Sequence, residues 1–326
     1  MLRSPGLNDG PPPLRRVCDA RQPDHRRGGI VELRDIEIFL TLAEELHFGR
    51  TAQRLRLSPA AVSQSIAKQE RRIGARLFDR SSRQVRLTPL GRQFRDDVRA
   101  IPGSLRRSLD RATLTASGKV AVLRVGMIGD NAYDLGPYWS AFRSLHPSWD
   151  LSVRRSSFVD PFEPLRRGDI DVLIAWLPVQ ESDLTVGPVV CAEPMVAMMA
   201  AGHPLAGDGK VSLEVFGDRG LFGAGTPLPE YWEDAYMPFA TPSGRPVERR
   251  HTVMACEEVP TIVATSDAID ITSAHVARYG ARPDLTYLPV SDAPPLRWAL
   301  VWHTESETEP VRALARVVRD LGTFTE

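Results

Sequence analysis

The chain has 326 residues, a length that exceeds one ordinary domain and predicts two or three. Its formal net charge is zero, yet residues 1–115 hold 23 Lys and Arg against 13 Asp and Glu, whereas residues 116–326 hold 18 against 28. This basic front part favours a polyanion as partner. Three widely separated cysteines argue against a disulfide framework or a zinc site, and no membrane span or signal peptide is visible, so we expect a cytoplasmic protein without a cofactor.

Residues 1–30 contain a triple proline, scattered arginines and no apolar periodicity. This composition predicts a disordered extension. It is either a basic arm that adds weak affinity for a polyanion or an extension without a role, and we favour the second interpretation.

Residues 31–88 predict a winged helix-turn-helix. An amphipathic pattern from Ile36 to Ala43 indicates a first helix, and a short second helix fits residues 49–55. Ser58 can cap a third helix, and Pro59 has the fixed φ that its first position favours. The buried stripe expected on this third helix comprises Val62, Ile66 and Ile73.

The other side of the third helix suits the major groove of DNA. Ser63 and Gln64 can donate to and accept from base edges, and Ala60 allows close approach to a thymine methyl group. Two short strands, 77–78 and 85–87, then enclose a basic hairpin that can reach phosphates or a minor groove. The candidate DNA-binding residues are Ser58, Pro59, Ala60, Ser63, Gln64, Lys68, Arg80, Ser82 and Arg83.

Residues 32–91, from ELRDIEIFLTLAEELHFGR to RQVRLTPLG, resemble the N-terminal domain of the LysR-type transcriptional regulators over about sixty residues without a gap. The resemblance implies that the start of the third helix reads bases and that the wing holds the backbone. Two positions depart from the common pattern, because Pro59-Ala60 stands where Gln-Pro is frequent and Gln64 where Arg is frequent. The family's base contacts therefore cannot be copied unchanged. The alternative is a packed three-helix core without a DNA contact.

Residues 89–116 predict a linker helix capped by Thr88. Pro102-Gly103 interrupts the helix, and the proline should kink it. The resemblance implies that its apolar seam pairs with the same helix of a second subunit, and the alternative is that the seam packs on its own domain. The seam comprises Leu90, Phe94, Val98, Ile101, Leu105, Leu109 and Ala112.

Residues 117–326 show apolar strand patterns that alternate with helical ones, which predicts an open α/β body. Strands are expected at LRVGMI, LSVRR, DVLIAW, PMVAMMA, AIDIT and RWALVW, and a closing helix at 310–321 with Val311, Leu314, Val318 and Leu321 on one side. MVAMMAAGHPLA and the C-terminal region resemble the LysR effector domain. The implied fold class is an α+β two-part chain: a winged helix-turn-helix with a long linker helix, then a two-lobed effector domain like the periplasmic binding proteins.

In such a body a small molecule binds between the lobes, at the ends of strands. We expect Asp130 to repel a carboxylate and to await a cation on the ligand, with Trp176 offering a cation–π face beside it. An amine, a sugar or a neutral effector has as much weight as an acid, and no effector remains an option. The candidate effector-binding residues are Gly129, Asp130, Asn131, Ser157, Trp176 and Thr265.

No catalytic constellation is visible. Ser65 and Lys68 match an SxxK pattern by chance, because no partner motif accompanies them. We therefore expect a regulator and no enzyme, and the runner-up is a two-lobed solute-binding or enzymatic protein with an appended helical domain. The expected partners are double-stranded DNA, the chain itself as dimer or tetramer, a small-molecule effector and, as a further candidate, RNA polymerase.

Overall fold

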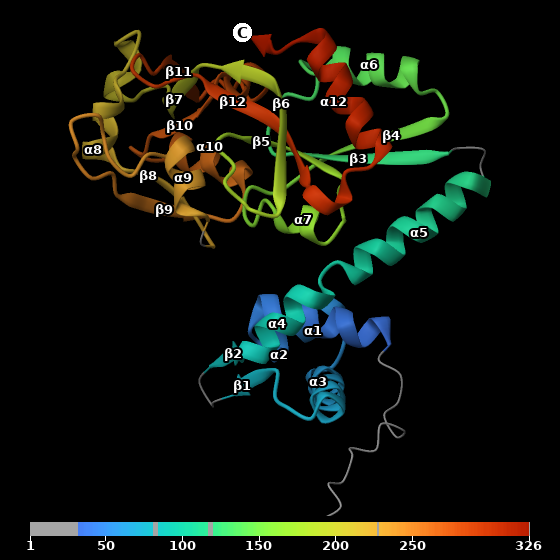
Figure 1. Ribbon diagram of the computed structural model, residues 1–326. Coiled ribbons are helices and arrows are strands. Elements are labelled where there is room, and N and C mark those ends of the chain that lie inside the picture. Colours follow the sequence, from blue (N-terminus) through green and yellow to red (C-terminus); the bar gives the residue numbers. More distant parts are fainter. Residues whose placement is uncertain (1–31, 81–83, 117–119, 227, 326) are drawn as a thin grey trace, which may run out of the picture. The chain divides into compact units, whose positions relative to one another are not determined.

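The computed structural model describes residues 32–80, 84–116, 120–226 and 228–325. The predicted extension, residues 1–30, lies outside these ranges. The chain divides into two compact units, Met1–Arg92 and Gln93–Glu326 (Figure 1). Among the described residues, no helix is both long enough and apolar enough to cross a membrane.

The first unit is a three-helix bundle with a small antiparallel hairpin, as predicted. Phe39 of the first helix and Phe78 of the hairpin are fully buried, with ring centroids 5.5 Å apart. Val62 and Ile66 are also fully buried, but Ile73 is 39% exposed, so its place in the buried stripe was wrong. Ile73 is the last residue of its helix, where the chain turns away from the bundle. The elements are α1 (Leu33–Glu45), α2 (Phe48–Leu55), α3 (Pro59–Ile73), β1 (Phe78–Arg80) and β2 (Val85–Leu87).

Side-chain caps fix the short turns between these helices. His47 Nδ1 accepts the N–H of Gly49 at 3.1 Å at the start of α2, and Ser58 Oγ accepts the N–H of Ala61 at 3.1 Å at the start of α3. Gly74 ends α3 with φ 82°, a conformation that glycine adopts without strain. The cap at Ser58 therefore helps to hold the short turn between α2 and α3.

A buried polar cluster joins α1 to α3. Asp35 accepts Ser65 Oγ at 2.8 Å and Lys68 Nζ at 3.0 Å, and its backbone carbonyl accepts Gln69 Nε2 at 2.9 Å. Burial alone would raise the pKa of the Asp35 carboxyl, but the hydrogen bonds from Lys68 and Ser65 outweigh it, so the pKa is lowered. This cluster fixes the orientation of α3 on α1.

The predicted linker helix is two helices, α4 (Pro89–Val98) and α5 (Ile101–Ala116). Thr88 Oγ1 accepts the N–H of Gly91 at 2.9 Å and so caps α4. The predicted kink within one helix is instead a break between two helices, because α4 ends at Val98 and α5 begins at Ile101. Pro102 lies in the first turn of α5, where its missing N–H costs little.

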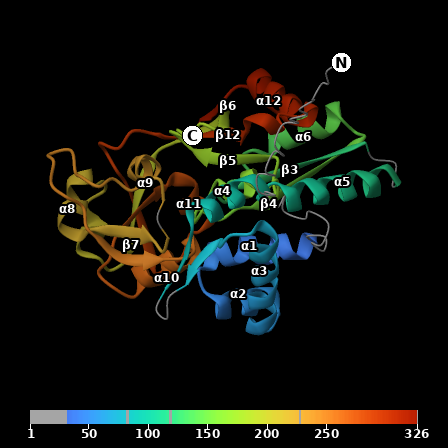
Figure 2. The ribbon, with the colours of Figure 1, turned by 60° about the horizontal axis from the view of Figure 1, so that its bottom comes forward.

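One face of α5 packs on its own effector domain. Gly103 is buried, and a Cβ placed on it would come 1.5 Å from the carbonyl oxygen of Arg167, so only glycine permits this contact. Arg106 reinforces the contact with an ion pair to Asp169 at 2.6 Å. Figure 2 shows α5 running alongside β3 (Ala121–Met127).

The other face of α4 and α5 leaves large apolar side chains at the surface. Val98 of the predicted seam is buried, but Leu109 is 60% exposed. The alternative that the whole seam packs on its own domain is thus wrong. The exposed large members are Leu90, Ile101, Leu105 and Leu109, and Ala112 is exposed as well.

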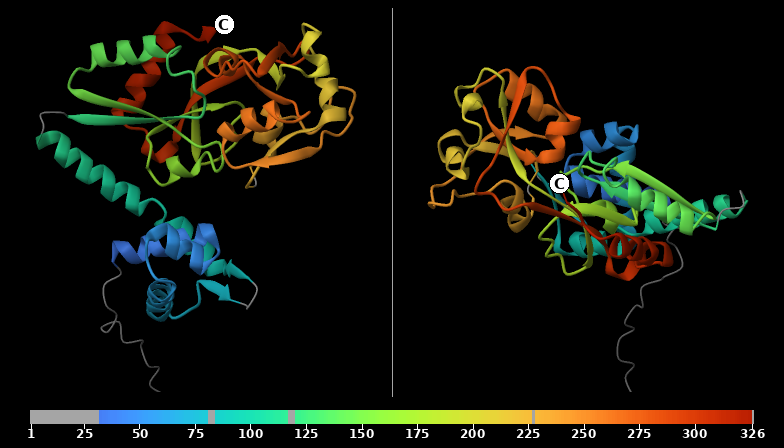
Figure 3. Two further views of the ribbon diagram at one scale, coloured as in Figure 1. Left: turned by 180° about the vertical axis from the view of Figure 1, so that it is seen from behind. Right: turned by 90° about the horizontal axis from the view of Figure 1, so that it is seen from above.

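A six-stranded sheet forms the first lobe of the effector domain, in the order β13-β6-β12-β5-β3-β4. Its strands β3, β4 and β5 are parallel, and β12 runs antiparallel to β5 and β6. Helices α6 and α12 lie side by side on this sheet (Figure 3). Leu321, predicted to face the core, is 53% exposed because α12 ends there. The remaining elements are β4 (Trp149–Arg155), β5 (Val172–Trp176), β6 (Leu184–Glu193), β12 (Leu296–His303), β13 (Phe324–Thr325), α6 (Gly136–Leu145), α7 (Glu163–Arg166), η4 (Thr304–Ser306) and α12 (Glu309–Leu321).

The second lobe lies between β6 and β12 in the sequence. It contains an antiparallel sheet in the order β10-β7-β11 and a parallel pair β8-β9. Its elements are β7 (Met195–Ala200), η1 (Pro204–Gly207), η2 (Leu213–Val215), α8 (Phe216–Arg219), β8 (Leu221–Ala224), α9 (Glu230–Tyr236), β9 (Arg249–Val253), η3 (Cys256–Glu258), α10 (Val259–Ala264), β10 (Asp270–Ser273), α11 (Ala274–Tyr279) and β11 (Leu285–Pro289).

Candidate DNA interface and effector pocket

The start of α3 presents five of the predicted DNA-binding residues at or near the surface. Ser58, Pro59, Ala60 and Gln64 are exposed, and Ser63 is half-buried on the same side. They lie opposite Val62 and Ile66, which are fully buried in the bundle. This is the geometry that a recognition helix needs, with its N-terminal turns free to enter a groove.

Other predicted DNA contacts differ or lie outside the described residues. Lys68 pairs with Asp35 at 3.0 Å and lies 3.8 Å from Glu32, so the charge that we expected to face DNA is neutralised within the domain. Ser82 and Arg83 lie outside the described residues, as does the side chain of Arg80.

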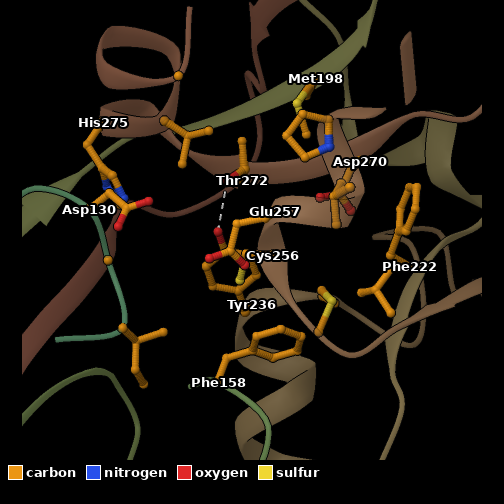
Figure 4. A pocket seen from close by; sticks show the side chains of 18 of the residues that line it. Asp130, Phe158, Met198, Phe222, Tyr236, Cys256, Glu257, Asp270, Thr272 and His275 are labelled. Atoms are coloured by element: carbon orange, nitrogen blue, oxygen red, sulfur yellow. Dashed lines mark hydrogen bonds between the residues drawn. The ribbon is translucent and has the colours of Figure 1, made fainter. Parts of the chain in front are cut away.

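A cavity of about 400 Å³ lies between the two lobes of the effector domain. The first lobe contributes Gly129 and Asp130, which follow β3, and Trp176 at the end of β5. The second lobe contributes mainly apolar and aromatic side chains. Figure 4 shows Met198, Phe222, Tyr236, Asp270, Thr272 and His275 around the cavity.

Asp130 lines the cavity but does not await a cation from a ligand. Arg155 of β4 lies 3.4 Å from Asp130 and 2.7 Å from Glu257. The expectation that the protein leaves Asp130 unpaired was therefore wrong. The sequence could not show this pair, because the arginine comes from the neighbouring strand, 25 residues further along the chain.

Trp176 lines the cavity but does not offer it a free ring face. Its ring stacks on Trp232 with a centroid distance of 3.5 Å and an interplanar angle of 12°. Each indole N–H donates to the backbone carbonyl of the other residue, at 2.9 and 3.0 Å. Trp176 is 3% exposed, so this pair joins the two lobes beneath the cavity, and the predicted cation–π face at Trp176 was wrong.

Three further candidates do not line the cavity. Asn131 is buried, and its amide nitrogen lies 4.0 Å from the sulfur of Cys191. Ser157 Oγ accepts the N–H of Val159 at 3.1 Å, which shapes the loop after β4. Thr265 ends α10, where its hydroxyl donates to the carbonyl of Thr261 at 2.8 Å.

The cavity also contains groups that the sequence did not single out. Asp270, the first residue of β10, is 7% exposed, and burial raises its pKa to about 7. Burial also raises the pKa of Tyr236, whose hydroxyl lies 3.0 Å from that of Thr272. The available signal was an aspartate within the apolar strand AIDIT, which we interpreted only as a strand.

A buried His–Glu pair lies beside the cavity. His275 Nδ1 is 2.8 Å from Glu193, and the backbone N–H of His275 donates to the same carboxylate at 3.0 Å. Both side chains are almost fully buried. Because Glu193 ends β6, where the chain passes to the second lobe, the pair fixes α11 at the junction of the lobes.

Two ion pairs connect the lobes at the rim. Arg155 of the first lobe contacts Glu257 of the second at 2.7 Å, and Asp134 of the first lobe contacts Arg278 of the second at 2.7 Å. A two-lobed body that closes over an apolar cavity, joined to a winged helix-turn-helix, defines a ligand-responsive DNA-binding regulator.

The chain belongs to the LysR family. The model of the bacterial regulatory helix-turn-helix protein, lysR family, matches residues 33–92, and that of the LysR substrate binding domain matches residues 116–322. The chain is a DNA-binding transcriptional regulator of this type and not an enzyme. LysR regulators form oligomers and bind small-molecule effectors.

Several curated relatives are named as HTH-type transcriptional regulators. The chain is 31% identical to the HTH-type transcriptional regulator AlsR of Bacillus subtilis over 210 residues, which cover 64% of this chain and 68% of AlsR. It is 36% identical to the uncharacterized regulator YnfL of Escherichia coli over 186 residues, 56% of this chain and 62% of YnfL. The regulator IlvR of Caulobacter vibrioides is 25% identical over 300 residues, 90% and 99% of the two chains.

Solved structures support the fold. CbnR, a LysR family transcriptional regulator, matches with a TM-score of 0.59 at 20% identity, over 89% of this chain and 98% of CbnR. Full-length CbnR in complex with its target DNA matches with a TM-score of 0.56 at 21% identity, over 89% and 100% of the chains. The predicted fold class is thus confirmed.

Proposed function

We propose that this regulator recognises an operator through the N-terminal part of α3. Ala60, Ser63 and Gln64 contact base edges, and Ser58 and Pro59 approach the phosphate backbone. The observation that supports this assignment is the exposure of these side chains at the capped end of a helix whose opposite side is buried. Arg80, Ser82 and Arg83 of the wing complete the contact with phosphates.

The operator should contain two half-sites, because α4 and α5 pair with the same helices of a second subunit. The support is the row of exposed apolar side chains, of which Leu105 is 42% and Leu109 is 60% exposed. Removing such side chains from water gains about 25 cal/mol per Å² of apolar area, which favours pairing of the two subunits.

We further propose that the cavity between the lobes binds the effector, and that the protein acts in the cytoplasm, where its operator lies.

Binding to the DNA upstream of the protein's own gene tests the recognition residues. Gln64→Ala and Ser63→Ala should each weaken specific binding by about 1–3 kcal/mol per base contact while leaving binding to random DNA unchanged. Gln93→Ala removes an exposed amide from α4, outside the helix-turn-helix, and is the matched control. An equal loss on operator and random DNA would show that α3 does not read bases through these residues.

A further inference from the structure

The cavity between the lobes contains one carboxylate whose charge the protein does not balance. Asp270 is only 7% exposed, and its Oδ1 has no hydrogen-bond partner among the described residues. Backbone N–H groups of Ile271 and Phe222 stabilise the charged form, but burial outweighs them and raises the pKa to about 7. An unpaired buried carboxylate of this kind is costly unless a partner arrives.

The cations around Asp270 are engaged elsewhere. Arg155 lies between Glu257 and Asp130, and Arg249 pairs with Glu233 at 2.8 Å and donates to the carbonyl of Pro238 at 3.1 Å. Arg249 is close enough to lower the pKa of Asp270, but less than burial raises it. Without a ligand, Asp270 is therefore neutralised by a proton, and a cationic group on a molecule in the cavity can take the place of that proton.

The remaining cavity chemistry disfavours an anion. Among the described residues that line it, three bear carboxylates, Asp130, Glu257 and Asp270, and one, Arg155, bears a guanidinium. The walls near Asp270 are apolar, with Met198 and Phe222 next to it in Figure 4. A carboxylate ligand would enter a region of excess negative charge and low polarity, where repulsion is stronger than in water.

We infer that the effector carries a basic nitrogen on an apolar body and that Asp270 is the counter-ion of that nitrogen. The inference rests on the proposed role of the cavity and specifies its ligand class. The ammonium pairs with the Asp270 carboxylate, and the apolar body contacts Phe222 and Met198. The hydroxyl groups of Tyr236 and Thr272, 3.0 Å apart, provide a polar site at a second position in the cavity.

Matched probes test the charge preference on the full chain. Phenethylamine, phenethyl alcohol and hydrocinnamate share one apolar body and differ in head group, and the same three head groups on a naphthyl body cover a larger ligand. Isothermal titration near pH 7 should show that amines bind about tenfold or more tightly than alcohols, because the amine makes a hydrogen bond to a charged group and the alcohol does not. Carboxylates should bind most weakly. Titration in two buffers of different ionisation enthalpy should show that amine binding releases a fraction of a proton, because Asp270 becomes charged.

Variants identify the group responsible. Asp270→Asn should reduce amine affinity at least about tenfold and leave alcohol affinity within about twofold. Asp267→Asn is the control, because this carboxylate is 92% exposed and lies outside the cavity. The wild-type ranking of head groups stands on its own if Asp270→Asn fails to fold.

Three results would overturn the inference: carboxylates that bind as tightly as amines, amine affinity that Asp270→Asn does not change, or no binding of any amine. Operator binding by the same preparation separates this failure from a failure of the proposed function. A chain that binds its operator and prefers carboxylates is a regulator with the opposite ligand class.

Discussion

Replacing Asp270 by Asn should stabilise the effector domain, and more so at alkaline pH. In the unfolded chain this carboxyl titrates at its ordinary 3.8, whereas burial raises its pKa to about 7 in the folded domain. Because the folded form keeps its proton to higher pH, the free energy of unfolding falls as pH rises from 3.8 through 7. At 1.36 kcal/mol per unit the whole loss is about 4 kcal/mol, and about half of it falls between roughly pH 5.5 and 8.5.

Thermal unfolding followed by tryptophan fluorescence measures this effect. All six tryptophans lie in the effector domain, from Trp139 to Trp302, so the signal reports that domain alone. The gap in Tm between Asp270→Asn and wild type should widen by about 4–8 °C from acid to alkaline pH, which is the shift expected for about 2 kcal/mol in a domain of this size. Asp267→Asn should follow the wild-type curve. Parallel curves for Asp270→Asn and wild type would refute the buried charge.

Three further changes test the other parts of the molecule. Asp35→Ala should cost the first unit about 1–3 kcal/mol, seen as a helical circular-dichroism transition at lower temperature with unchanged tryptophan fluorescence. Because folding lowers the pKa of Asp35, the stability that its charge contributes should be lost as pH falls through the lowered pKa. A stability difference that does not shrink in acid would contradict this reasoning. Gly103→Ala should expose the linker to limited proteolysis, whereas Gly136→Ala, which meets no atom within 4 Å, should not. Leu105→Glu with Leu109→Glu should give monomers in sedimentation velocity, and an unchanged oligomer would remove α5 from the interface.

The fold could be predicted where local patterns determine it. Ser58 and Pro59 marked the start of α3, because a cap and a fixed φ act within one turn. The resemblance over residues 32–91 predicted the three helices and the hairpin together. By contrast, β6, β8, β9, β11 and β13 were not predicted. Four of them mix polar and apolar residues, β8 is only four residues long, and all of them depend on pairing partners that lie elsewhere in the chain.

The candidate pocket was only partly predictable. Strand order placed Gly129, Asp130 and Trp176 correctly at the cavity, since parallel strands end at one edge of a sheet. The electrostatic state of Asp130 was not predictable, because its cation comes from Arg155 on another strand. Asp270 was missed for the same reason, as its burial depends on packing between β7, β8 and β10.

The contact between Gly103 and the backbone carbonyl of Arg167 has a mechanical consequence. Because no side chain separates the two backbones, and because Arg106 is paired with Asp169, α5 and the first lobe should rotate as one rigid lever. If a ligand draws the second lobe inward, α5 should keep its position on the first lobe. Labels on α5 and on the first lobe should therefore keep a constant separation whether or not an effector is bound.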